Sequence, residues 1–249
     1  MTRAAEKTFA GVLASNAQRA SDELAFTFLS EKGDVAVTNG ELYEKAQGIA
    51  RRLRETLPLG ARTMILFPPG IDYVASVFGC FAAGVIGVSA VPPHPARLHR
   101  TLPRLLAIAE DAEVEAVLTT QAIKESAQPL LSGGGDTPLA KAEWIASDDD
   151  AVMALTGSSD TLVDFTNEVA FLQYTSGSTA TPRGVMLTQA NLIENAASIT
   201  KHFGMHDESV GFIWLPPYHD MGLIGGILQP VYIGAHCALM NPLTVIKRP

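Results

Sequence analysis

The chain has 249 residues, of which 47% are hydrophobic, and a formal net charge of −8 at pH 7. This composition is ordinary for a globular protein and allows one large domain or two smaller ones. The negative charge, without a basic stripe, argues against nucleic-acid binding. Cys80 and Cys237 lack zinc-site spacing, and the N-terminus lacks the apolar core of a secretory signal, so we expect reduced thiols and a cytoplasmic location.

The predicted elements alternate between helix and strand. Thr38 and Glu41 can form a capping box at the start of the first predicted helix. Apolar spacing predicts helices over residues 38–57, 74–84 and 102–112, and strands over 64–67, 85–91 and 114–119. This alternation predicts an α/β fold with mixed, largely parallel sheets flanked by helices.

Two uncharged stretches, residues 73–96 and 221–246, are long enough to cross a bilayer. Glycines interrupt the first, and glycines and prolines interrupt the second. Buried helix-plus-strand units of a parallel sheet have this pattern, so we expect no membrane span.

An irregular acidic stretch at residues 147–167 is a candidate domain boundary. We therefore predict a first α/β subdomain over 1–165 and the start of a second over 166–249.

The most informative segment, residues 171–185, reads FLQYTSGSTATPRGV. A buried strand over 169–174 is predicted to enter a loop of hydroxyls and glycine, and Thr188 to cap a following helix. Backbone N–H groups near Gly177 can approach an anion closely, and Arg183 adds positive charge. A polyphosphate site is therefore predicted from Thr175, Ser176, Gly177, Ser178, Thr179 and Arg183. The alternative is a solvated linker; the ordinary P-loop pattern GxxxxGK[ST] does not occur.

A second segment, residues 214–224, reads WLPPYHDMGLI. An apolar strand, a Pro-Pro break and a helix-like run from Met221 place His219 at a strand's exit, where ligands bind in open α/β sheets. A lone histidine is more often structural than catalytic. His202 and His206 have metal-compatible spacing, but Gly204 is expected to end their helix and no third ligand is evident, so no metal site is predicted from residues of this chain.

These segments resemble the adenylate-forming superfamily: acyl- and aryl-CoA synthetases, peptide-synthetase adenylation domains, luciferases and fatty acyl-AMP ligases. Its phosphate loop reads YTSGSTGxPKG; here Ala180 replaces a glycine and Arg183 a lysine, which keeps the charge. WLPPYHDMGLI matches WLPxxHDMGL, and residues 66–95 resemble the early core segment PPGxxYxxxxxGCxxAGxxxVPxxPP. Gln173 and the His-Asp-Met-Gly form are most similar to fatty acyl-AMP ligases.

The resemblance implies part of the large N-terminal domain of such an enzyme. It implies that ATP is bound through the phosphate loop, with Mg²⁺ held by a ligand outside this chain. It implies that His219 is catalytic, orienting a carboxylate and the α-phosphate, and that Asp220, Met221 and Gly222 line an acyl pocket. The implied partners are a fatty acid and an acyl carrier protein with a phosphopantetheine arm, in polyketide or lipid biosynthesis.

Two other functions stay open. The chain could belong to an acyl-CoA synthetase or a peptide-synthetase adenylation domain, or be a truncated module that binds without catalysing. The superfamily's adenine segment, ribose aspartate, hinge and catalytic-lysine domain have no match after residue 224. We therefore expect an N-terminal part of a longer ligase that is inactive alone.

Overall fold

The computed structural model describes residues 7–92, 98–132, 135–149, 152, 168–175 and 182–247. The described strands are β1 (Leu24–Leu29), β2 (Val35–Thr38), β3 (Arg62–Ile65), β4 (Ile86–Ser89), β5 (Ala116–Thr119), β6 (Glu143–Ala146), β7 (Val169–Tyr174), β8 (Gly184–Thr188), β9 (Val210–Ile213) and β10 (His236–Met240). The described helices are α1 (Phe9–Arg19), α2 (Asn39–Thr56), α3 (Ile71–Ala83), α4 (Leu98–Asp111), α5 (Gln121–Ser132), α6 (Pro138–Lys141), α8 (Gln189–Phe203), α9 (Asp220–Leu223), α10 (Gln229–Ile233) and α11 (Pro242–Lys247), with a π-helix, η2 (Ile224–Leu228), between α9 and α10.

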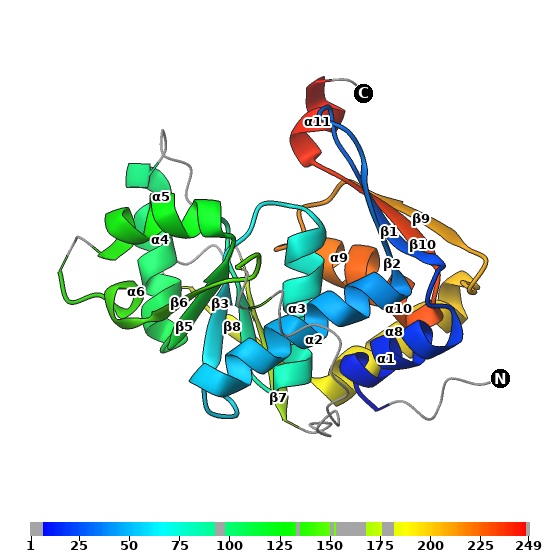
Figure 1. The fold of residues 1–249 in the computed structure, drawn as a ribbon, viewed down its shortest axis with the longest axis horizontal. Helices are drawn as coiled ribbons and strands as arrows, with labels where there is room; N and C mark the ends of the chain where they lie inside the picture. Colours follow the sequence, from blue (N-terminus) through cyan, green and yellow to red (C-terminus); the bar gives the residue numbers. More distant parts are fainter. Residues whose placement is uncertain are drawn as a thin grey trace.

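The strands form two sheets (Figure 1). In the larger sheet the order is β6-β5-β3-β4-β7-β8, and all pairs are parallel except β7 with β8. In the smaller sheet the order is β2-β1-β10-β9, and β1, β10 and β9 are mutually parallel. The predicted α/β fold with largely parallel sheets is thereby confirmed.

Each sheet takes strands from both sides of the predicted boundary at residue 165. β7 and β8 extend the sheet that contains β3 to β6, and β1 pairs with β10 from the far end of the chain. The division into two subdomains stays a prediction. Any such division has to account for two sheets that are interleaved along the sequence.

The core joins the two sheets through helices α1, α2 and α3. One buried apolar cluster contains Phe26 of β1, Phe78 of α3 and Phe171 of β7. A second cluster packs α4 and α5 on the opposite face of the larger sheet, against side chains such as Val88 and Val117. The larger sheet is therefore covered on both faces, which explains why its strands are nearly continuous apolar runs.

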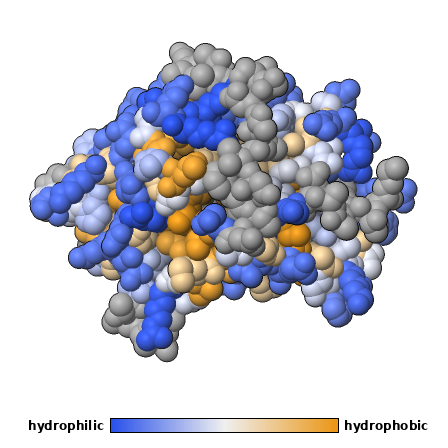
Figure 2. Space-filling model, turned by 90° about the horizontal axis from the view of Figure 1, so that it is seen from below, coloured by the Kyte–Doolittle hydropathy of each residue, from blue (hydrophilic) through white to orange (hydrophobic). Residues whose placement is uncertain are grey.

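The two uncharged stretches lie within this architecture. The first forms α3 and β4, whose side chains are almost entirely buried. No helix among the described residues is long and apolar enough to cross a membrane. The face of the molecule seen in Figure 2 is mainly hydrophilic, with an apolar area near its centre.

Capping signals predicted the start of α2 and the end of α8 correctly. The Thr38 hydroxyl accepts from the Glu41 N–H at 3.2 Å, and Glu41 Oε2 accepts from the Thr38 N–H at 2.9 Å, which confirms the capping box. Gly204 ends α8 in the left-handed conformation, with φ 63°. Strand ends are less well placed: β3 covers residues 62–65 rather than 64–67, and β4 covers 86–89 rather than 85–91. α3 begins at Ile71 and α4 at Leu98, earlier than predicted.

Candidate functional site

A cavity of about 430 Å³ lies where the carboxyl ends of β4 and β7 meet α4 and the loop after β9. Thr175, at the start of the predicted phosphate loop, and His219 both line it. Its other lining residues include Ser89, Arg104, Gln173, Tyr174, Tyr218 and Asp220. The two predicted motifs, about 40 positions apart in sequence, therefore meet at the end of the sheet where α/β proteins bind ligands.

The ends of the predicted phosphate loop are held together by main-chain contacts. The Thr175 N–H donates to the Arg183 carbonyl at 3.3 Å, and Tyr174 pairs with Gly184 in the antiparallel β7–β8 ladder. Arg104 Nη2, from α4, donates to the Thr175 carbonyl at 3.0 Å. Thr175 and Arg183 are both exposed. Ser176, Gly177, Ser178 and Thr179 lie outside the described residues, so their phosphate contacts stay predictions.

Strand β8 follows the loop and was not predicted. We expected a helix capped by Thr188 after the loop; a strand that ends at Thr188 comes between them. Thr188 does cap α8, accepting from the Asn191 N–H at 3.1 Å. The apolar segment GVML in residues 184–187 was the available strand signal.

Tyr174 fixes the wall of the cavity next to the loop. Its hydroxyl donates to Asp111 Oδ2 at 2.5 Å. Burial raises the pKa of Tyr174, and the hydrogen bond and negative charge of Asp111 raise it further. The phenol therefore stays protonated at neutral pH. A Cβ atom at Gly184 would lie 3.0 Å from Tyr174 Cζ, so glycine there allows β8 to pack closely on the ring.

The loop that carries His219 is a tight turn into α9. The His219 N–H donates to the Pro216 carbonyl at 3.0 Å, and the His219 carbonyl accepts from the Leu223 N–H at 2.8 Å. The His219 Nδ1 atom lies 2.5 Å from Asp220 Oδ1, and both side chains are more than half exposed. A hydrogen bond from Nδ1 to this carboxylate orients the ring and leaves Nε2 for a ligand.

The predicted acyl-pocket residues do not lie on one enclosed wall. Asp220 lines the cavity, and the Met221 side chain is 63% exposed. Gly222 is buried against the loop before His219: a Cβ atom there would lie 2.0 Å from the Pro216 carbonyl oxygen. The role of these three residues toward an acyl chain stays a prediction.

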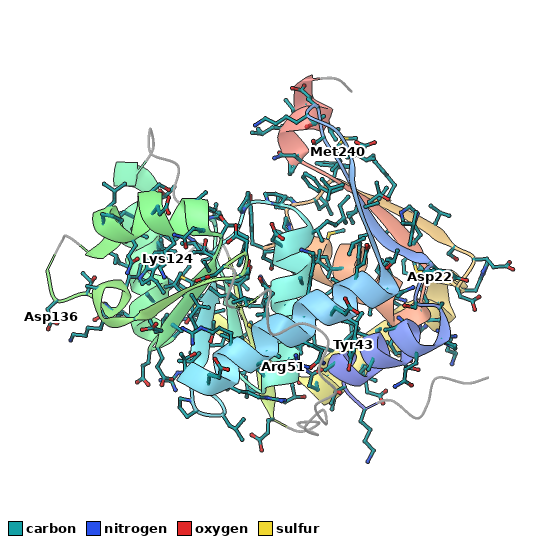
Figure 3. The ribbon with its side chains drawn as sticks, in the orientation of Figure 1. Asp22, Tyr43, Arg51, Lys124, Asp136 and Met240 are labelled. Carbon is teal, nitrogen blue, oxygen red and sulfur yellow. The ribbon has the colours of Figure 1, made fainter. Side chains whose placement is uncertain are left out.

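A second cavity, of about 500 Å³, adjoins the first. The two share Val91, Pro216 and Tyr218, and the second extends between α5 and the start of α11. In Figure 3, Lys124 marks α5, and Met240 marks the end of β10, shortly before α11 begins. None of the described residues that line this second cavity is charged, and most of them are proline, alanine, leucine, isoleucine or valine.

Side chains that could bind a metal ion do not cluster in the part of the chain that the structure describes. Among the described residues, no group of three or more His, Cys, Asp or Glu side chains could hold a metal ion. The His202 Nδ1 atom donates to the Ser198 carbonyl at 2.8 Å, within its own helix. Arg104 and Gln173 were not assigned to the site from sequence: an arginine on a helix gives no specific signal, and Gln173 served only to indicate the branch of the superfamily.

The family of the chain follows from comparison with known proteins. The family model described as "AMP-binding enzyme" matches residues 13–248. The chain therefore belongs to the AMP-binding enzyme family, which confirms the resemblance described above.

Its relatives include named fatty-acid ligases. The chain is 39% identical over 231 residues to the medium-chain-fatty-acid–[acyl-carrier-protein] ligase JamA of Moorena producens (strain JHB), a match that covers 90% of this chain and 38% of JamA. It is 31% identical to the long-chain-fatty-acid–AMP ligase FadD23 of Mycobacterium tuberculosis (strain CDC 1551 / Oshkosh), covering 92% of this chain and 40% of that protein.

A solved structure agrees with these sequence matches. The fatty acyl-adenylate ligase from L. pneumophila, in complex with acyl adenylate and pyrophosphate, is similar with a TM-score of 0.84 and 32% identity. The match covers 99% of this chain and 42% of that chain. This chain thus spans about 40% of the length of the relatives it matches.

Proposed function

We propose that the protein containing this chain activates a fatty acid with ATP to form acyl-AMP and pyrophosphate, and transfers the acyl group to an acyl carrier protein. The observation that carries the proposal is that Thr175 and His219, from two separate motifs, line one cavity at the carboxyl ends of the strands. The similarity to JamA and to the L. pneumophila ligase supports the fatty acid and, through the name of JamA, the carrier protein.

The first step joins a carboxylate oxygen to the α-phosphorus of ATP and breaks the bond from that phosphorus to the bridging oxygen, so pyrophosphate leaves. Catalysis of such a step depends mainly on positioning and on stabilising negative charge. Thr175, Ser176, Gly177, Ser178, Thr179 and Arg183 would bind the β- and γ-phosphates. His219 Nε2 would contact the carboxylate and the α-phosphate, with Asp220 holding Nδ1.

Magnesium would neutralise part of the phosphate charge in a reaction of this class. The described residues offer no cluster of ligands for it. We therefore assign no magnesium ligand to this part of the protein, and the roles given to His219 and the loop do not pass through the ion.

The preference for a fatty acid rests on the apolar surroundings of the site. The second cavity adjoins His219's loop, and none of its described lining residues is charged, so the ammonium group of an amino acid would find no carboxylate partner among them. Met221 adds an exposed apolar side chain beside His219. Either surface suits an alkyl chain.

Mass spectrometry of the reaction products tests the proposal. The protein as its gene encodes it is incubated with ATP, magnesium and fatty acids of different lengths, with either coenzyme A or a phosphopantetheinylated carrier protein. We expect acyl-AMP, acyl-carrier protein and little acyl-CoA. Efficient acyl-CoA formation would assign the protein to the acyl-CoA synthetases, and preference for an amino acid to the peptide-synthetase domains. Residues 1–249 expressed alone should form little acyl-AMP.

A further inference from the structure

Gln173 is a buried polar residue in the last part of β7. Its side chain is only 8% exposed, yet it lines the 430 Å³ cavity together with Thr175 and His219. A buried amide is costly unless its hydrogen-bonding groups are satisfied. The nitrogen and the oxygen of this amide therefore each favour a hydrogen-bond partner.

The amide nitrogen binds the loop that carries His219. Gln173 Nε2 donates to the Tyr218 carbonyl at 3.2 Å, across 45 positions of sequence. A carbonyl oxygen can only accept, so the amide is oriented with its nitrogen toward Tyr218. Tyr218 directly precedes His219, and Gln173 stands two positions before Thr175. One side chain thus ties the His219 loop to the strand that leads into the phosphate loop.

The amide oxygen has no partner among the described residues. Gln173 Oε1 is buried and makes no hydrogen bond there. Because this oxygen is also shielded from solvent, the Tyr218 carbonyl is the hydrogen-bond partner that fixes the amide among the described residues.

We propose that Gln173 is a positioning residue, which holds His219 at its working distance from Thr175 through the Tyr218 carbonyl. This inference rests on the proposed adenylation activity and adds a residue that acts through His219 rather than on the substrate's reacting atoms. Its loss should misplace His219 and therefore lower the rate of adenylation more than the binding of ATP.

The chain offers a matched control in Gln229. That glutamine is 1% exposed, its Nε2 donates to Thr200 Oγ1 at 2.8 Å, and its Oε1 also lacks a partner among the described residues. It lines neither the 430 Å³ nor the 500 Å³ cavity. Methionine at position 173 or 229 keeps the side-chain length and removes the amide. The two variants therefore differ mainly in whether the lost amide contacted the His219 loop.

The test measures fatty-acid adenylation and thermal unfolding of the protein as its gene encodes it. Gln173→Met should lower kcat about tenfold, because it removes about one hydrogen bond's free energy from the transition state. The KM for ATP should change less than about twofold. Gln229→Met should change kcat less than about twofold. In a His219→Ala background, Gln173→Met should lower kcat by less than about twofold further, because the residue through which Gln173 acts is already gone. Gln173→Asn retains polarity but is one methylene shorter; it provides a second variant if Gln173→Met folds poorly, with the same expected loss.

The outcomes separate the two proposals. If the unaltered protein forms no acyl-AMP, the proposed function fails and this inference fails with it. If the unaltered protein is active but folded Gln173→Met or Gln173→Asn matches Gln229→Met in kcat, only the positioning role is overturned. A full tenfold loss that persists in the His219→Ala background would also overturn it.

Discussion

A methyl group at position 222 should disturb the His219 loop. In the Gly222→Ala variant, the new Cβ would lie 2.0 Å from the Pro216 carbonyl oxygen, 2.7 Å from its carbonyl carbon and 3.1 Å from the Leu215 carbonyl oxygen. Contacts of Cβ atoms essentially never fall below 3.0 Å. The helix and the loop must therefore separate by about 1 Å, the difference between 3.0 and 2.0 Å, and the atoms in the way are backbone atoms that cannot rotate aside.

The same Pro216 carbonyl accepts from the His219 N–H, so the shift acts directly on the candidate catalytic loop. Overpacking of this kind costs about 1–3 kcal/mol of unfolding free energy. For a chain of this size, each kcal/mol lowers Tm by about 2–4 °C. Displacing a catalytic group by about 1 Å can lower the rate about a hundredfold.

Gly225→Ala is the control, because a Cβ atom at position 225 meets no atom within 4 Å. Alanine is favoured over glycine in helices by about 1 kcal/mol, so Gly225→Ala should unfold at the same or a higher temperature. Thermal unfolding by circular dichroism and acyl-AMP formation are measured for both variants. Equal stability and equal activity of Gly222→Ala and Gly225→Ala would refute the packing of α9 on the His219 loop.

Further predictions concern the buried cysteines, Arg104 and Met221. Burial raises the pKa of both Cys80 and Cys237 to about 12. Iodoacetamide at pH 8 should therefore alkylate the native thiols at least about a hundredfold more slowly than the thiols of the unfolded protein. Rapid alkylation of the native protein would show that the thiols are accessible. Because these folded-state pKa values exceed the unfolded value of about 9, the thiols' contribution to stability should be complete below pH 9 and fall progressively toward pH 12. Arg104→Gln removes the donor to the Thr175 carbonyl and should raise the KM for ATP about threefold to tenfold. The control Arg52→Gln breaks an exposed ion pair with Glu55 and should leave the KM unchanged. Equal KM values in the two variants would show that Arg104 does not belong to the ATP site. Met221→Trp and Ala127→Leu each narrow one of the two apolar surfaces that suit an alkyl chain, so one of them should shorten the longest fatty acid accepted and thereby locate the acyl tail. An unchanged chain-length limit in both variants would exclude both surfaces.

Sequence reasoning located features that depend on neighbouring residues. The capping box at Thr38 and the cap at Thr188 each depend on positions three apart, and β7 covers residues 169–174 as predicted. The His219 turn was placed at the exit of β9 because a Pro-Pro break interrupts an apolar run there. These signals are local, so they can be detected without knowledge of the fold.

Other features depend on contacts between distant positions. The pairing of β1 with β10 brings residues near 26 and 237 together, and no local pattern specifies that partner. The contacts from Arg104 to Thr175 and from Gln173 to Tyr218 span 71 and 45 positions. The resemblance to a known superfamily identified both motifs, whereas the residues that position them became evident only from the folded chain.

Fatty-acid-dependent exchange of labelled pyrophosphate into ATP tests the central claim most directly, because it reports the reversal of acyl-AMP formation without any acceptor. The protein as its gene encodes it should catalyse exchange with a fatty acid and not with amino acids. His219→Ala should lower the exchange rate about a hundredfold, whereas His202→Ala, on an exposed face of α8, should not change it. Exchange that is absent with every fatty acid, or that is unchanged by His219→Ala, would contradict the assignment of adenylation to the cavity between Thr175 and His219.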